Sequence, residues 1–214
     1  MPRIVETVVY ELPELPRNAR ERARAWYRDT CLDWDWYDAA FEDFQTICVL
    51  LGVTLRTHTV QLMGGGTREA PNLWFSGFAH QGAGASFNAT YRYARAASRA
   101  IRSYAPNDET LHAIADDLQR VQRRNLYQLG ARIRQSGRYY HEYSMTIEVE
   151  RDSPAGQAMT DDAEDTIVEA IRDLARWLYR QLEREYDYLT SDAAVDEAIA
   201  DHRWTFTEAG DRFG

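Results

Sequence analysis

Polar and apolar residues alternate along residues 87–93, as is typical of a strand with one buried face. The apolar side of this segment carries Phe87, Ala89, Tyr91 and Tyr93. The preceding segment, residues 73–78, is almost wholly apolar, and Gly82 and Gly84 allow positive φ between the two. The pattern therefore predicts a β-hairpin. Its polar turn is formed by His80, Gln81, Gly82 and Gly84.

Other alternating segments predict further strands at residues 3–12 and 53–62, a hairpin from 127 to 149 that turns at Ser136 and Gly137, and a short strand near 204–210. Residues 64–71, which begin with three glycines, are expected to form a loop. Apolar residues spaced three and four apart predict helices near 16–30, 33–51, 94–104, 107–124, 161–189 and 192–199. We therefore expect a single α+β domain over residues 1–214. Its antiparallel sheet would have about five to six strands packed with helices, and the long helix near the C-terminus would span the sheet or reach a second copy in a homodimer.

Composition narrows the function classes. All 25 basic residues are arginine, which excludes a catalytic or phosphate-binding lysine, and the net charge of −9 disfavours general affinity for nucleic acid. The two cysteines argue against a disulfide framework, and Cys48 lies on the apolar side of a predicted helix. No apolar run approaches the ~20 residues of a membrane span, and the first residues do not form a signal peptide, so a cytoplasmic protein is expected.

Acidic residues gather on the predicted helix 33–51. The set comprises Asp35, Asp38, Glu42 and Asp43. Paired carboxylates can bind a metal or exchange protons, but no histidine follows at the spacing of a carboxylate–histidine metal site. Carboxylates near a helix start also interact favourably with the helix dipole. We interpret the set as a solvated acidic surface that could bind a protein partner, and expect no metal or cofactor.

Arginines are concentrated in the middle of the chain. Residues 92–138 contain ten arginines and four acidic residues, a net charge of +6, whereas the rest of the chain carries −15. The candidate nucleic-acid face comprises Arg92, Arg95, Arg99, Arg102, Arg132 and Arg134. Tyr91, Tyr93 and Tyr139 could stack on bases beside it. The arginines near 132 and the acids near 148 could also pair across the predicted hairpin.

Local catalytic motifs are missing from the sequence. The chain contains no nucleophile elbow, no Cys-x-x-Cys, no His-Glu-x-x-His and no dinucleotide fingerprint. His80, or His141 with Glu142, could still form a small site if the fold brought them together. His141 falls on the apolar side of its predicted strand, where a half-buried structural role is the alternative. A non-catalytic protein is favoured.

Several aromatic and glycine motifs carry a resemblance over nearly the whole chain. They include Phe75-Ser76-Gly77-Phe78, Gln81-Gly82-x-Gly84-Ala85-Ser86-Phe87, Ser136-Gly137-x-Tyr139-x-His141-Glu142 and the Trp177–Leu189 segment. In these motifs the chain resembles a family of small acidic proteins encoded by tailed phages and prophages, some of them labelled antitoxins. The resemblance implies a mobile-element context and no catalytic residues. Where that family often has an acid between the two turn glycines, this chain has Ala83.

Three functional hypotheses follow. The first is a phage or mobile-element accessory protein that binds and inhibits a host defence protein, in the manner of an anti-CRISPR or anti-restriction inhibitor, or a toxin. The second is a nucleic-acid-binding regulatory protein that uses the arginine-rich middle. The third is a small enzyme with a histidine–glutamate site.

Overall fold

The computed structural model describes residues 6–32, 34–78 and 82–214. The chain divides into two compact units. The central unit is Ala39–Leu182, and the terminal unit combines Met1–Asp38 with Glu183–Gly214. The α+β class is confirmed, and the sheets are antiparallel. That all 214 residues form one domain stays a prediction.

The main sheet of the central unit has four antiparallel strands in the order β1-β6-β7-β8. These strands are β1 (Val53–Leu55), β6 (Ala89–Arg92), β7 (Leu129–Gln135) and β8 (Met145–Arg151). Ala89 pairs with Ile133 and Ala131 with Val149, which places the apolar residues on one face. Arg92 and Arg132 point to the opposite, exposed face. The sheet is smaller than expected from the sequence because the remaining strands form separate two-stranded ladders.

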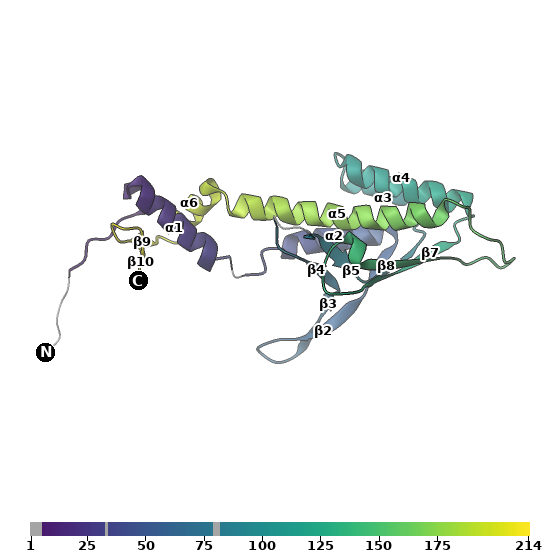
Figure 1. The fold of residues 1–214 in the computed structure, drawn as a ribbon, viewed down its shortest axis with the longest axis horizontal. Helices are drawn as coiled ribbons and strands as arrows, with labels where there is room; N and C mark the ends of the chain where they lie inside the picture. The colour runs from purple at the N-terminus through teal and green to yellow at the C-terminus, as the bar shows by residue number, and fades with distance from the viewer. Residues whose placement is uncertain (1–5, 33, 79–81) are drawn as a thin grey trace. The chain divides into compact units, whose positions relative to one another are not determined.

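Four helices accompany the sheet: α2 (Asp38–Leu51), α3 (Ala97–Tyr104), α4 (Glu109–Arg124) and α5 (Ala163–Leu189). Figure 1 shows α3, α4 and α5 on one side of the β7–β8 pair. The apolar spacing that predicted the long helix is confirmed as its buried side, since Ile167, Ile171 and Leu178 are fully buried. Phe44 of α2 packs against Phe87 with ring centroids 5.4 Å apart. These contacts bury the apolar face of the sheet, which is the main driving force for folding this unit.

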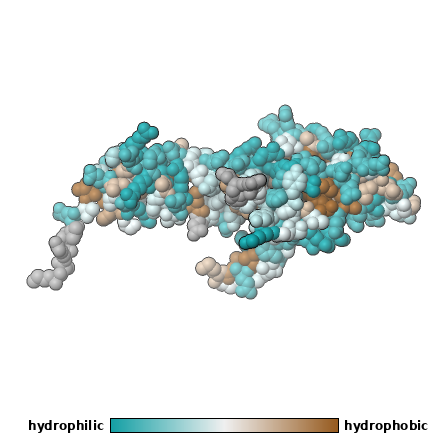
Figure 2. All heavy atoms as spheres, in the orientation of Figure 1, coloured by the Kyte–Doolittle hydropathy of each residue, from teal (hydrophilic) through white to brown (hydrophobic). Residues whose placement is uncertain are grey.

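Two short ladders complete the central unit. β4 (Leu73–Phe75) pairs with β5 (Ala85–Phe87), so a hairpin does form at the predicted place. Its second strand is wrong, however, because the alternating segment 89–92 is the separate strand β6, which pairs with β1 and β7 in the main sheet. β2 (Thr57–Gln61) pairs with β3 (Thr67–Pro71) to form a hairpin that projects from the rest of the unit in Figure 1. The tip of this hairpin exposes Leu62 and Met63, and hydrophobic residues are visible along it in Figure 2.

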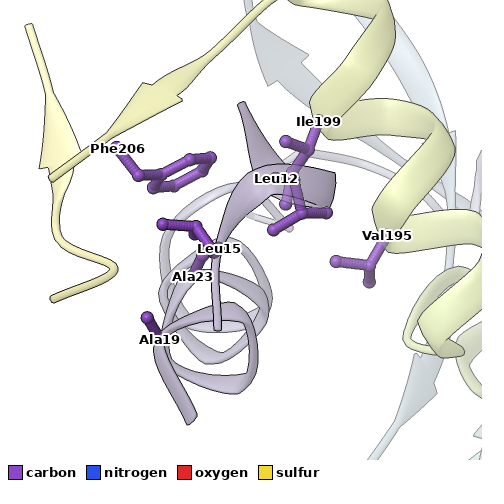
Figure 3. Close-up of a cluster of buried hydrophobic side chains, with 7 residues drawn as sticks. All are labelled: Leu12, Leu15, Ala19, Ala23, Val195, Ile199 and Phe206. Atoms are coloured by element: carbon purple, nitrogen blue, oxygen red, sulfur yellow. The ribbon is translucent and has the colours of Figure 1, made fainter. Parts of the chain in front are cut away.

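The terminal unit joins both ends of the chain. Its elements are η1 (Leu12–Glu14), α1 (Arg17–Thr30), α6 (Asp192–Asp201), β9 (Thr205–Phe206) and β10 (Arg212–Phe213). Figure 3 shows its small core, which is made of Leu12, Leu15, Ala19, Ala23, Val195, Ile199 and Phe206. Arg24 of α1 binds Asp196 of α6 through two hydrogen bonds of 2.7 and 2.6 Å, and it also contacts Asp192. The unit is therefore held by a core and by a charged clamp between α1 and α6.

Several sequence-based boundaries are wrong. Of the strand predicted at 3–12, the described part contains only a bridge between Tyr10 and Phe206, because Pro13 leads the chain into the 3-10 turn η1. The second helix begins at Asp38 instead of residue 33. The predicted loop at 64–71 contains strand β3. In the 127–149 hairpin, residues 136–144 form a connection with the 3-10 turn η2 (Glu142–Ser144), so His141 is not in a strand.

Candidate functional site

Two of the four carboxylates predicted to form an acidic surface near α2 accept hydrogen bonds from tyrosine hydroxyls. Asp35 accepts a hydrogen bond from the Tyr37 hydroxyl (2.8 Å), and Asp43 accepts one from the Tyr104 hydroxyl (2.6 Å). The bond to Asp43 raises the pKa of Tyr104. The carboxylates of Asp38 and Glu42 are exposed and form no hydrogen bond or ion pair with the described residues.

The predicted polar turn is a structural junction where the structure describes it. His80 and Gln81 lie outside the described residues. Gly82 has φ +85°, as expected, but Gly84 does not have positive φ. A Cβ at Gly84 would lie 2.6 Å from the Cβ of His141, so this position requires glycine for close packing. The Gly84 amide donates to the Ser76 hydroxyl (3.0 Å), which in turn donates to the Tyr140 carbonyl (3.2 Å).

His141 and Glu142, which were considered as a small catalytic site, both make structural contacts. The Nδ1 of His141 accepts a hydrogen bond from the Tyr143 amide (3.0 Å). Glu142 pairs with Arg176 of α5 at 3.0 Å, and Arg176 also binds Glu169 and Asp173. The pKa of Glu169 is lowered chiefly by its hydrogen bond from Arg176. Among residues 6–32, 34–78 and 82–214, no three His, Cys, Asp or Glu side chains form a group that could hold a metal ion.

The six candidate arginines fall into two sets. Arg92, Arg132 and Arg134 lie on the exposed face of the main sheet. The predicted pairing across the β7–β8 hairpin is confirmed for Arg132, which approaches Glu148 at 3.5 Å. Arg92 of β6 reaches past Gly130 of β7 and binds Glu150 of β8 at 3.0 Å, a contact that was not predicted. Much of the positive charge on this face is therefore neutralised within the sheet.

The other arginines line an open hollow beside α3 and α4. The hollow has a volume of about 640 Å³ and is lined by Tyr93, Arg95, Ala96, Ser98, Arg99, Arg102, Asp116 and Gln119. An adjoining hollow of about 240 Å³ is lined by Arg92, Tyr93, Tyr127, Gln128, Leu129 and Asp152. Because Tyr93 belongs to both, we treat the two hollows as one surface. We call it the Tyr–Arg groove.

Positive charge in the Tyr–Arg groove is only partly compensated. Arg102 forms a two-point contact with Asp116, with Nη1–Oδ1 and Nη2–Oδ2 distances of 3.0 and 2.6 Å. These bonds, with one from Ser98, lower the pKa of Asp116. Arg95 and Arg99 are exposed and make no side-chain hydrogen bond or ion pair with the described residues. Two guanidinium groups are therefore free to bind an anionic ligand.

Aromatic rings form the middle of the groove. The rings of Tyr93 and Tyr127 have centroids 4.5 Å apart, and Tyr127 is 47% exposed. Its neighbour Leu126 is 60% exposed. Exposed aromatic faces beside arginines are typical of surfaces on which nucleic-acid bases stack. The prediction that Tyr91 stacks on bases is wrong, because this residue is 1% exposed. Tyr139 is exposed but lines neither hollow.

Unusual backbone conformations gather at this surface. Of four described non-glycine residues with positive φ, Ala96 (63°) and Tyr127 (61°) line the groove and Leu126 (55°) precedes Tyr127. Such conformations cost about 1–3 kcal/mol each and are found preferentially at functional sites. The Tyr127 amide donates to the Gln122 carbonyl (2.7 Å), which helps to hold the turn. The sequence did not reveal Tyr127 as a surface residue, since periodicity placed it inside a strand that begins only at Leu129.

Comparison with known families gives one match. A family model described as a domain of unknown function, DUF8835, matches residues 36–192. The chain belongs to this family. No curated protein and no solved structure matches the chain.

The family match includes all of the central unit, and hence the whole Tyr–Arg groove. Most of the terminal unit, residues 1–35 and 193–214, lies outside it. The described helices include none with the length and apolar character needed to cross a membrane.

Proposed function

We propose that the protein is a non-catalytic binding protein that holds single-stranded nucleic acid in the Tyr–Arg groove. The observation that carries the proposal is the combination, in two open hollows that share Tyr93, of the unpaired Arg95 and Arg99 with the exposed ring of Tyr127. Phosphates need cations, and unpaired bases need flat apolar surfaces. The groove supplies both.

Each part of the groove has a chemical role in this proposal. Arg99 is in the first turn of α3 and Arg95 precedes the helix, and both line the same hollow, so both can contact phosphates there. Tyr127 and Tyr93 offer ring surface for one or two bases. Stacking on aromatic rings does not depend on which base is present, so binding is expected to be tolerant of sequence.

The net charge of −9 is consistent with a local site. Acidic residues elsewhere on the surface repel phosphates, which would confine a nucleic acid to the groove and weaken non-specific binding. Binding should weaken as salt increases, because each phosphate contact releases counterions, and the dependence should be shallow because only a few phosphates are neutralised.

The test is fluorescence anisotropy with labelled 20-nucleotide oligo(dT) and oligo(U) at several salt concentrations. We expect binding at low salt that weakens as salt increases. Replacing both Arg95 and Arg99 by Gln should reduce the slope of log K against log salt by about 1.4, since each phosphate contact on a single strand contributes about 0.7. Tyr127→Ala should weaken binding by about tenfold through the loss of one stacked base.

Arg123→Gln is the matched control. Arg123 is exposed on α4 and makes no side-chain hydrogen bond or ion pair with the described residues, but it does not line the groove. This variant should bind as the unchanged protein does. Absence of binding at low salt, or an equal loss in the Arg123 variant, would refute the groove as the site.

A second candidate is the binding and inhibition of a host defence protein or a toxin by a phage-encoded accessory protein. It is supported by Asp38 and Glu42, which lie one turn apart on α2 with exposed, unpaired carboxylates. An acidic surface of this kind could occupy a partner's nucleic-acid groove. A pull-down from a host lysate tests this function. Capture of one stoichiometric protein, and its loss when both Asp38→Asn and Glu42→Gln are introduced, would favour inhibition of a protein partner over nucleic-acid binding.

A further inference from the structure

The terminal unit contains a pocket of its own, separate from the Tyr–Arg groove. Its volume is about 240 Å³, and its apolar walls are formed by Leu12, Pro13, Ile199 and Trp204. Two arginines, Arg20 and Arg203, also line it. A small pocket with mostly apolar walls and a few charged groups is the usual form of a small-molecule site.

Arg20 leaves one donor unused beside these walls. Its Nη2 donates to the carbonyl oxygens of Pro13 (2.8 Å) and Leu15 (3.2 Å), which fixes the guanidinium against η1. Its Nη1 makes no hydrogen bond with the described residues, and Arg20 lines the pocket. A guanidinium with a free donor at a pocket wall can bind an anion there.

Arg203 is the second cation. It follows α6 directly and has φ +53°, one of the few described non-glycine residues with positive φ. Its amide donates to the Ala200 carbonyl (3.0 Å), but its guanidinium makes no hydrogen bond or ion pair with the described residues. The strained backbone thus presents a cation without a partner at the pocket.

The acidic residues near the pocket do not neutralise these arginines. Asp196 also lines the pocket, but Arg24 occupies both of its carboxylate oxygens. Glu11 is exposed, so its charge is screened by solvent and salt. The pocket is therefore cationic at one part and apolar over the rest.

We infer that this pocket binds a small carboxylic acid with a short apolar group. The carboxylate would accept hydrogen bonds from Arg20 Nη1 and from the guanidinium of Arg203, which suits the geometry of a carboxylate and a guanidinium. The apolar group would lie against Leu12, Ile199 and Trp204. The same chemistry is present in a free acid and in a peptide with an apolar C-terminal residue.

Isothermal titration calorimetry on the full chain tests the inference, with hexanoate as the probe. We expect hexanoate to bind at least about tenfold more tightly than hexanamide, which has a similar shape but no charge, and hexylamine not to bind. The tripeptide Ala-Ala-Leu, with a free or an amidated C-terminus, distinguishes the sources. Tighter binding of the free tripeptide than of hexanoate would assign the site to a peptide terminus, and the reverse to a free acid.

Two variants and a control locate the site. Arg203→Gln should weaken the binding of hexanoate by about tenfold. Ala200→Trp fills the pocket from α6 without removing a charge, so it should abolish hexanoate binding. Arg17→Gln removes an exposed arginine of α1 that does not line the pocket, and it should have no effect. No heat with millimolar hexanoate, equal binding of hexanoate and hexanamide, or full binding by the Ala200 variant would overturn the inference.

Discussion

The buried residue Tyr91 connects the main sheet to α4 beneath the Tyr–Arg groove. The Gln122 side chain donates to the Tyr91 hydroxyl (3.2 Å) and to the Leu129 carbonyl (2.7 Å), and it accepts from the Leu129 amide (3.2 Å). Gln122 is fully buried, and its side chain takes part in all three of these hydrogen bonds. The network fixes the start of β7 and the end of α4, between which Tyr127 is presented.

Ionisation of Tyr91 should destabilise the fold at high pH. Burial raises the pKa of Tyr91 to about 12, despite the opposing hydrogen bond from Gln122. An unfolded tyrosine titrates near about 10, so between about pH 10 and about pH 12 the unfolded chain loses a proton that the folded chain keeps. The stabilisation is complete below about pH 10 and decreases as pH rises through about 12, by up to about 3 kcal/mol.

Urea unfolding from pH 9 to 12 measures this effect. Tyr91→Phe should flatten the loss of unfolding free energy over that range, although it lowers stability at neutral pH by removing a buried hydrogen bond. Tyr139→Phe, at an exposed tyrosine, should retain the slope of the unchanged protein. An unchanged slope in the Tyr91 variant would show that other groups cause the alkaline loss of stability.

At the scale of elements, the β2–β3 hairpin should be the least protected ladder of the central unit. Most of its residues are exposed, and its five-residue ladder receives little support from an apolar core. An isolated two-stranded hairpin is marginally stable in water. We expect its amides to exchange hydrogen at least about 100-fold faster than those of β6 and β7, a difference of about 2.7 kcal/mol in opening free energy.

Hydrogen exchange with peptide-level mass spectrometry provides the measurement, and β6–β7 is the internal reference. Equal protection of the two ladders would contradict the expectation and would mean that a second molecule covers the hairpin. If that protection decreased on dilution, the covering molecule would be another copy of this chain, in agreement with the homodimer considered from the sequence.

Elements with strong periodicity were predictable from the sequence, and the others depended on distant contacts. The stripes of α4 and α5 and the alternation in β6 and β7 were predicted because each presents one continuous apolar face to the same core. The strand β3 lacks such a face, so its Thr-Arg-Glu-Ala-Pro sequence indicated a loop. The arginines of the Tyr–Arg groove were predicted because they are clustered in the sequence. Tyr127 was not, because it lies in a turn with positive φ that periodicity does not reveal.

At the scale of the whole molecule, the two chain ends form the terminal unit, most of which lies outside the residues that match the family. Its core is small, so one large-to-small substitution should affect it strongly. Ile199 is 1% exposed and packs in that core (Figure 3), and Ile199→Ala should cost about 2–4 kcal/mol. We expect hydrogen-exchange protection to decrease in α1 and α6.

The response of the central unit to Ile199→Ala decides whether the chain is one domain. The helix α5 runs from one unit into the other without a break, so it could transmit unfolding between them. If the core of the central unit is sufficient by itself, protection in β6 and β7 and oligonucleotide binding should both be unchanged in this variant. Ile47→Ala, at a fully buried position of α2, is the matched control, and should reduce protection in the central unit directly. Loss of protection in β6 and β7 after Ile199→Ala would instead show one cooperative domain over residues 1–214, and the terminal pocket could then influence the groove through stability.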